Sequence, residues 1–169
     1  MFASIKAKLR DMRTIKQLCE AAEAHALSDH QRKPGAEHFL LAALDLSDGT
    51  AELAFKRVGA DPARLNQAIE QQYRMALQSI GLSVELQGME ALPQEEQSGV
   101  YNSAASGTEV MQCLASQRRD HAPLLGAHVV AIIAAMPSGV AARALRAMNI
   151  DTNALRAAAE EAADSHAFA

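Results

Sequence analysis

Apolar and polar residues alternate along the chain with the period of α-helices rather than that of strands. Apolar side chains recur every three or four residues through eight segments, which places them on one face of a helix. The segment between the fourth and fifth of these contains three glycines and one proline, a composition typical of a loop. The pattern therefore predicts an all-α fold. The predicted helices cover residues 4–27, 36–46, 50–58, 62–80, 105–118, 127–136, 139–148 and 152–165.

Two stretches ninety positions apart end one helix and begin the next in the same way. The stretch 57–65 reads RVGADPARL, and 147–155 reads AMNIDTNAL. In each, a residue that tolerates a positive φ follows a helix, and an Asp then offers an oxygen to the free N–H groups of the next helix. A leucine begins the core-facing side of that helix. The equivalent residues are Gly59 and Asn149, Asp61 and Asp151, and Leu65 and Leu155.

The correspondence continues towards the N-terminus without a gap, which indicates an internal repeat. Residues 38–65 placed on 128–155 share six identities, among them His38 and His128, together with several exchanges of one apolar residue for another. We therefore predict one domain that contains a duplicated four-helix unit. The domain covers residues 1–169 and consists of a first copy at about 4–80, a linker at 81–104 and a second copy at about 105–165.

Charge and composition narrow the classes of partner. The net charge is −4, whereas a surface for nucleic acid requires a concentrated excess of Lys and Arg. One basic group occurs in the first predicted helix, around an apolar stripe at helical spacing, and we interpret it as a solvated helix face. The basic residues are Lys6, Lys8, Arg10, Arg13 and Lys16. The stripe consists of Ile5, Leu9, Met12, Ile15 and Cys19. Binding to nucleic acid is therefore not expected.

Neither a membrane span nor an oxidising compartment is expected. The sequence contains no run of 18 uncharged apolar residues, and its first residues lack the apolar centre of a secretory signal. Cys19 and Cys113 fit a reducing cytosol, and two free thiols are favoured over one disulfide between them. These features predict a cytoplasmic protein.

The reactive side chains show no arrangement typical of an enzyme or a metal site. Six histidines are present, but no H-E-x-x-H or C-x-x-C occurs, and no Ser or Cys has an acid–base partner at a recognisable spacing. A His at the start of a buried helix more often satisfies a local hydrogen bond. We therefore predict no metal, no cofactor and no catalytic residue.

Two stretches carry a resemblance to a known family. PGAEHFLLAALDLSDGTAELAFKRVGADPARLNQAIEQ at 34–71 and LLGAHVVAIIAAMPSGVAARALRAMNIDTNALRAA at 124–158 resemble the N-terminal domain of Clp AAA+ unfoldases. The opening Met1-Phe2 and the long first helix also fit. The resemblance implies an eight-helix, pseudo-two-fold bundle without catalytic activity, which binds substrate proteins, degrons or adaptors in front of an ATPase ring. No G-x-x-x-x-G-K-[ST] motif occurs in the sequence, so P-loop ATP hydrolysis is not expected of it.

The resemblance also names candidate binding residues. In some members the Glu of a G-T-E-H motif helps to hold phosphorylated arginine, and Glu37 matches that position. The second copy reads Gly126-Ala127-His128 without the Glu, so half of such a pocket is absent and phosphoarginine recognition is not expected. Glu37 is equally explained by the preference of the first helical turn for acidic residues. For an apolar groove near the N-terminus, the candidates are Phe2, Val100 and Tyr101, each of which also fits a role in the core.

The leading hypothesis is a non-enzymatic peptide- or protein-binding domain that works with a Clp-type AAA+ ATPase, its adaptor or its client polypeptides, in a groove between the two copies. The alternative hypothesis keeps the fold and assigns a decoy that sequesters a small apolar ligand or antibiotic. Whether the chain is free-standing or part of a longer ATPase stays open.

Overall fold

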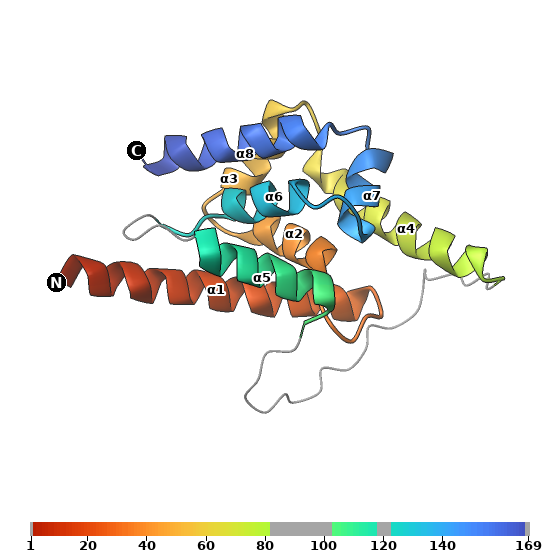
Figure 1. Cartoon of the computed structure of the whole chain (residues 1–169), viewed down its shortest axis with the longest axis horizontal. Coiled ribbons are helices and arrows are strands. Elements are labelled where there is room, and N and C mark those ends of the chain that lie inside the picture. The colour runs from red at the N-terminus through yellow and green to blue at the C-terminus, as the bar shows by residue number, and fades with distance from the viewer. Residues whose placement is uncertain (1, 82–102, 118–122, 168–169) are drawn as a thin grey trace.

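The computed structural model describes residues 2–81, 103–117 and 123–167, with the side chains of 2–5, 7 and 167 left out. These residues form eight α-helices, one 3-10 turn and no strand, which confirms the all-α prediction (Figure 1). Each predicted helix end lies within two residues of the observed one, except the start of the fourth helix, which was predicted at 62 and is observed at Leu65, after the 3-10 turn. The helices are α1 Phe2–Ser28, α2 Ala36–Asp45, α3 Thr50–Arg57, α4 Leu65–Ser79, α5 Ala105–Gln117, α6 Gly126–Ala134, α7 Val140–Ala147 and α8 Thr152–Ala167. The 3-10 turn, Pro62–Arg64, leads into α4.

The two predicted junctions have the same backbone and the same capping. Gly59 and Asn149 both adopt the left-handed conformation, with φ of 69° and 58°. Oδ1 of Asp61 accepts a hydrogen bond from the N–H of Ala63, and Oδ1 of Asp151 accepts one from the N–H of Asn153. The sequence pattern therefore specified both junctions correctly.

The two copies are interleaved rather than merely adjacent. The third helix of each copy packs on the fourth helix of the other, so that α3 contacts α8 and α4 contacts α7. The second helices, α2 and α6, lie against each other in the middle of the molecule (Figure 1). This reciprocal packing is the pseudo-two-fold arrangement that the internal repeat predicts.

Equivalent positions of the two copies fill one continuous core. Burial of these apolar side chains is the main favourable contribution to folding, at about 1.5–3 kcal/mol for each large side chain. The fully buried equivalent pairs are Phe39 and Val129, Phe55 and Leu145, and Leu65 and Leu155. Gly126 allows a close approach between the copies, because an added Cβ there would lie 2.7 Å from the carbonyl oxygen of Ala43 in α2.

Helix α1 buries a different face from the apolar stripe seen in the sequence. Leu18, Ala22 and Ala26 line its buried side, where α1 packs on α2. Leu9 and Met12 of the stripe are instead 53% and 64% exposed. The reason is geometric, because the first turns of α1 extend beyond α2 (Figure 1). The helical period was interpreted correctly, but no neighbouring helix covers this part of the stripe among the described residues.

No disulfide joins Cys19 and Cys113, and both side chains are partly buried. Of the two alternatives left open by the sequence, the structure therefore has the reduced one.

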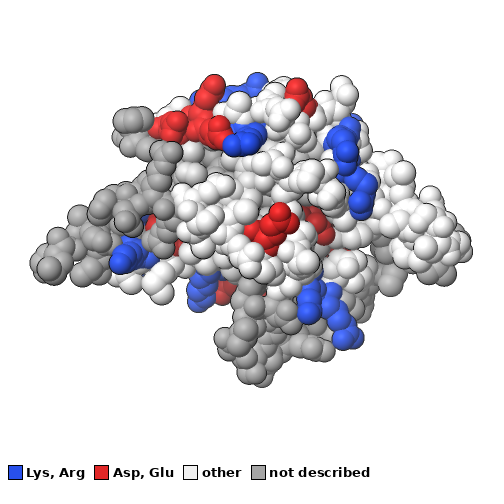
Figure 2. Space-filling model, in the orientation of Figure 1, with Lys and Arg blue, Asp and Glu red and all other residues white. Residues whose placement is uncertain are grey.

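Charged residues of both signs are scattered over the face shown in Figure 2, without a continuous area of one sign. Within the described residues, no helix combines the length and the apolar character needed to cross a membrane.

Candidate functional site

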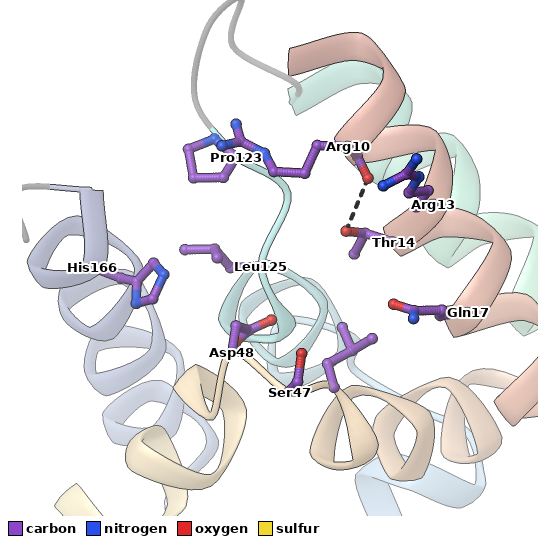
Figure 3. Close-up of a pocket in the computed structure, with 10 residues that line it drawn as sticks. Arg10, Arg13, Thr14, Gln17, Ser47, Asp48, Pro123, Leu125 and His166 are labelled. Carbon is purple, nitrogen blue, oxygen red and sulfur yellow. Dashed lines mark hydrogen bonds between the residues drawn. The ribbon is translucent and has the colours of Figure 1, made fainter. Parts of the chain in front are cut away.

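A cavity of about 540 Å³ opens where the two copies meet (Figure 3). Its walls are the first half of α1, the loop between α2 and α3, the segment that precedes α6, and the end of α8. The cavity thus combines elements of the first copy with elements of the second. The residues that line it are Arg10, Arg13, Thr14, Gln17, Leu46, Ser47, Asp48, Pro123, Leu125 and His166.

One wall is built by first-copy side chains that cap a second-copy helix. The first N–H groups of a helix have no partner within it. Oδ2 of Asp48 accepts a hydrogen bond from the N–H of Gly126 at 3.1 Å, and Oγ1 of Thr50 accepts one from the N–H of Ala127 at 2.9 Å. The Thr50 hydroxyl in turn donates to Oδ1 of Asp48. These bonds hold the α2–α3 loop against the start of α6, so this wall is pre-formed.

The opposite wall, α1, is tied to the second copy by a buried carboxylate. Asp11 is 3% exposed, and its Oδ1 accepts a hydrogen bond from the N–H of Leu124 at 3.2 Å. The neighbouring Arg10 has its Nε at 3.9 Å from the same oxygen, a long contact for an ion pair. Arg10 and Arg13 are both exposed and line the cavity. The arrangement gives the cavity fixed walls and solvated cationic groups.

Glu37, the carboxylate chosen from the sequence, lies at the N-terminal end of α2 and not in this cavity. The cavity is at the C-terminal end of α2, about 15 Å away for a helix of this length. Glu37 is only 6% exposed, and the Tyr73 hydroxyl donates to its Oε1 at 2.5 Å. A guanidinium ligand would have to share the carboxylate with Tyr73.

The surroundings of Tyr73 raise the pKa of its hydroxyl. Its burial, followed by the charge of Glu37 and the hydrogen bond to it, raises the pKa of the Tyr73 hydroxyl far above its ordinary value of 10. The hydroxyl therefore stays protonated and can donate to Glu37 at any pH at which the protein is normally studied.

His38 lies beside Glu37 and Tyr73 and holds the start of α2 by a local hydrogen bond. Its Nδ1 accepts a hydrogen bond from the N–H of Gly35 at 2.9 Å, which leaves the proton of the neutral ring on Nε2. Nε2 faces Oδ2 of Asp29 at 3.3 Å, and the ring stacks on Tyr73 with centroids 6.3 Å apart. His128 repeats the first of these bonds, since its Nδ1 accepts from the N–H of Leu125. Both histidines thus make the local hydrogen bond expected of them.

The other residues chosen from the sequence fall outside the described parts. Phe2 begins α1, but its side chain is not described, and Val100 and Tyr101 lie in the segment 82–102 that the structure does not describe. The three therefore stay predictions. Within the described ranges, no group of three or more His, Cys, Asp and Glu side chains is placed to hold a metal ion.

The sequence did not identify the cavity, although it contained part of the signal. Arg10 and Arg13 were noted and assigned to a solvated helix face, while Ser47 and His166 had no role. The Asp48-Gly49-Thr50 stretch is a readable start signal for α3, since Oδ1 of Asp48 accepts from the N–H of Thr50. Its second function, the capping of α6, joins residues 78 positions apart and has no local pattern.

Comparison with known proteins supports the resemblance seen in the sequence. Residues 13–88 match the family model of the Clp repeat (R) N-terminal domain. The match covers most of α1 and all of α2, α3 and α4, which is the copy with the better-preserved motif. No curated protein matches the chain.

Proposed function

We propose that the chain, whose residues 13–88 match the family model of the Clp repeat (R) N-terminal domain, is a non-catalytic protein-binding domain of this family. Its partners would be a Clp-type AAA+ unfoldase, an adaptor, or the client polypeptides of such a system. Work beside an unfoldase of this type would take place in the cytoplasm.

We propose the cavity between the copies as the place where a polypeptide segment binds. The observation that carries this proposal is that both copies line the cavity and that their hydrogen bonds fix its walls. A preformed cavity reduces the entropy that is lost when a flexible segment is captured. It also combines apolar Leu46 and Leu125 with polar and cationic side chains, the mixture that a peptide needs. Reversible capture at micromolar concentration corresponds to about −8 kcal/mol.

The same composition argues against the decoy alternative. A site for a small apolar ligand is lined predominantly by hydrophobic and aromatic side chains. Here Arg10, Arg13 and His166 contribute charged or polar groups, and no Phe, Tyr or Trp lines the cavity among the described residues. The peptide therefore fits the lining better than an apolar drug-like molecule does.

A pair of matched variants tests this proposal. Ser47 and Ser138 are both exposed, and each lies in the loop between the second and third helices of its copy, but only Ser47 lines the cavity. Ser47→Trp should fill the cavity and weaken binding of fluorescein-labelled casein, an unfolded client, by about tenfold, a change of 1.4 kcal/mol. Ser138→Trp should change it by less than about twofold. Equal affinity of the two folded variants for casein would refute the cavity as the binding site.

A further inference from the structure

The cavity has basic side chains on two opposite walls. Arg10 and Arg13 come from α1 in the first copy, and His166 comes from the end of α8 in the second. Figure 3 shows Arg10 and His166 on opposite sides of the cavity, with Leu125 between them. A ligand between these walls would therefore meet two guanidinium groups on one side and an imidazole on the other.

The acidic groups beside the cavity are already occupied by donors of the protein. Asp48 accepts hydrogen bonds from the N–H of Thr50, the hydroxyl of Thr50 and the N–H of Gly126. Asp11 is buried and accepts from the N–H of Leu124. These hydrogen bonds hold both carboxylates in place, so neither can fold over the arginines as a mobile acidic side chain would. In the described part of the chain, no hydrogen bond engages the guanidinium of Arg10 or of Arg13, and the contact of Arg10 with Asp11 is long.

The remaining surface of the cavity is apolar or weakly polar. Leu46 and Leu125 line it and are both buried. Pro123 lies beside Arg10 (Figure 3). An anion alone would leave this apolar surface in water, whereas a residue with an apolar neighbour would cover it.

We propose that the cavity recognises a carboxylate next to an apolar side chain, as found in an acidic peptide segment or at the C-terminus of a polypeptide. This inference rests on the proposed function, because it names the chemistry of the segment that the cavity receives. A guanidinium pairs with a carboxylate through two parallel hydrogen bonds, which supplies orientation as well as attraction. Two arginines and one histidine suit one carboxylate, whereas a nucleic-acid backbone needs a longer basic surface.

The test uses labelled peptides and the whole chain. Three fluorescein-labelled peptides share one short sequence of alanine and leucine: the first ends in a free carboxylate, the second is amidated, and the third is amidated but carries one internal glutamate. Fluorescence anisotropy should show that both carboxylate-bearing peptides bind about fivefold or more tightly than the neutral one, as expected for a partly screened charged hydrogen bond. Of these two peptides, the one with the higher affinity shows whether the cavity prefers a C-terminal or a side-chain carboxylate.

A charge-matched pair of variants ties this effect to the cavity. Arg10→Gln combined with Arg13→Gln should remove the preference for the carboxylate-bearing peptides. Arg146→Gln combined with Arg156→Gln removes the same total charge at positions that do not line the cavity, and should keep the preference. Loss of the preference in both double variants would show a general charge effect and overturn the inference.

Two further outcomes separate this inference from the proposed function. If Ser47→Trp abolishes casein binding but carboxylate-bearing and amidated peptides bind alike, the cavity is a binding site and the carboxylate preference is refuted. Unlabelled competitors give the second outcome. If an excess of inorganic phosphate displaces the carboxylate-bearing peptides, whereas the unlabelled neutral amidated peptide does not, the site takes any anion and the inference is again refuted. Displacement by the unlabelled carboxylate peptide, with phosphate inactive, supports it.

Discussion

Thr50 of the first copy and Ala127 of the second are joined by a buried hydrogen bond of 2.9 Å, in which the Thr50 hydroxyl accepts the backbone N–H of Ala127. Thr50 is 2% exposed, and the same hydroxyl donates to Asp48. One side chain therefore closes the first turn of α6 and orients the residue that caps its neighbouring N–H. This relationship links the copies and shapes the cavity between them.

Replacement of this hydroxyl should weaken the whole bundle. Thr50→Val keeps the shape of the side chain but leaves the buried N–H of Ala127 without its acceptor, which costs about 1–3 kcal/mol. Urea unfolding followed by circular dichroism should show this loss in the free energy of unfolding. Thr108→Val is the control, because Thr108 is exposed and its loss should stay within about 0.5 kcal/mol. Equal stability of the two variants would show that the bond across the copies contributes nothing.

The features that the sequence predicted well are those written within a few residues. A helix end, a left-handed residue and an Asp cap interact over two or three positions, as Asp61 does with the N–H of Ala63. The helical spacing of apolar residues then indicates which face each helix buries. Both the junction pattern and this spacing occur in each of the two copies. For this reason the eight helices and their pairing into two copies followed from the residues alone.

The features that the sequence missed depend on contacts between distant segments. Helical spacing showed that Leu9 and Met12 share a face, but not that α1 extends beyond the helix that would cover them. Likewise, the first-turn position of Glu37 did not indicate that Tyr73, 36 positions later, donates to its carboxylate. The cavity itself arises from four elements that no single motif connects.

The bond between Tyr73 and Glu37 should contribute measurably to stability. Tyr73→Phe leaves a carboxylate that is 6% exposed without this donor, and the loss should be about 1.5–3 kcal/mol, as for other hydrogen bonds to charged groups. A double-mutant cycle with Glu37→Gln isolates the interaction, and urea unfolding of the four proteins should give a coupling of about 1 kcal/mol. Additive losses would mean that the two side chains do not stabilise each other.

The ionisation of Tyr73 gives a prediction about alkaline pH. Its pKa is raised mainly by burial and then by Glu37, so the folded protein holds this proton more tightly than the unfolded chain does. The free energy of unfolding should therefore be unaffected by Tyr73 below pH 10, the ordinary pKa, and should fall as the pH rises above it.

Absorbance at alkaline pH checks this prediction directly. The chain contains two tyrosines, so Tyr101→Phe leaves Tyr73 as the single reporter. Tyrosinate absorbance in this variant should rise only when circular dichroism shows unfolding. A rise with its midpoint near pH 10 in the folded protein would show that Tyr73 is not shielded in this way. Tyr73→Phe in the same background should abolish the signal in both states.

The two left-handed junction residues predict a graded response to substitution. Gly59 has a φ of 69°, and no atom would lie within 4 Å of an added Cβ, so only backbone strain opposes a side chain there. Gly59→Ala should therefore cost about 1–2 kcal/mol. Gly59→Asn should cost less, because asparagine tolerates this conformation and already occupies it at position 149 with a φ of 58°. Asn149→Gly, the reciprocal change, should leave the free energy of unfolding within about 0.5 kcal/mol of the original. Equal losses for Gly59→Ala and Gly59→Asn in urea unfolding would mean that the junction relaxes away from the left-handed conformation, and that the two copies do not end their third helices by the same mechanism.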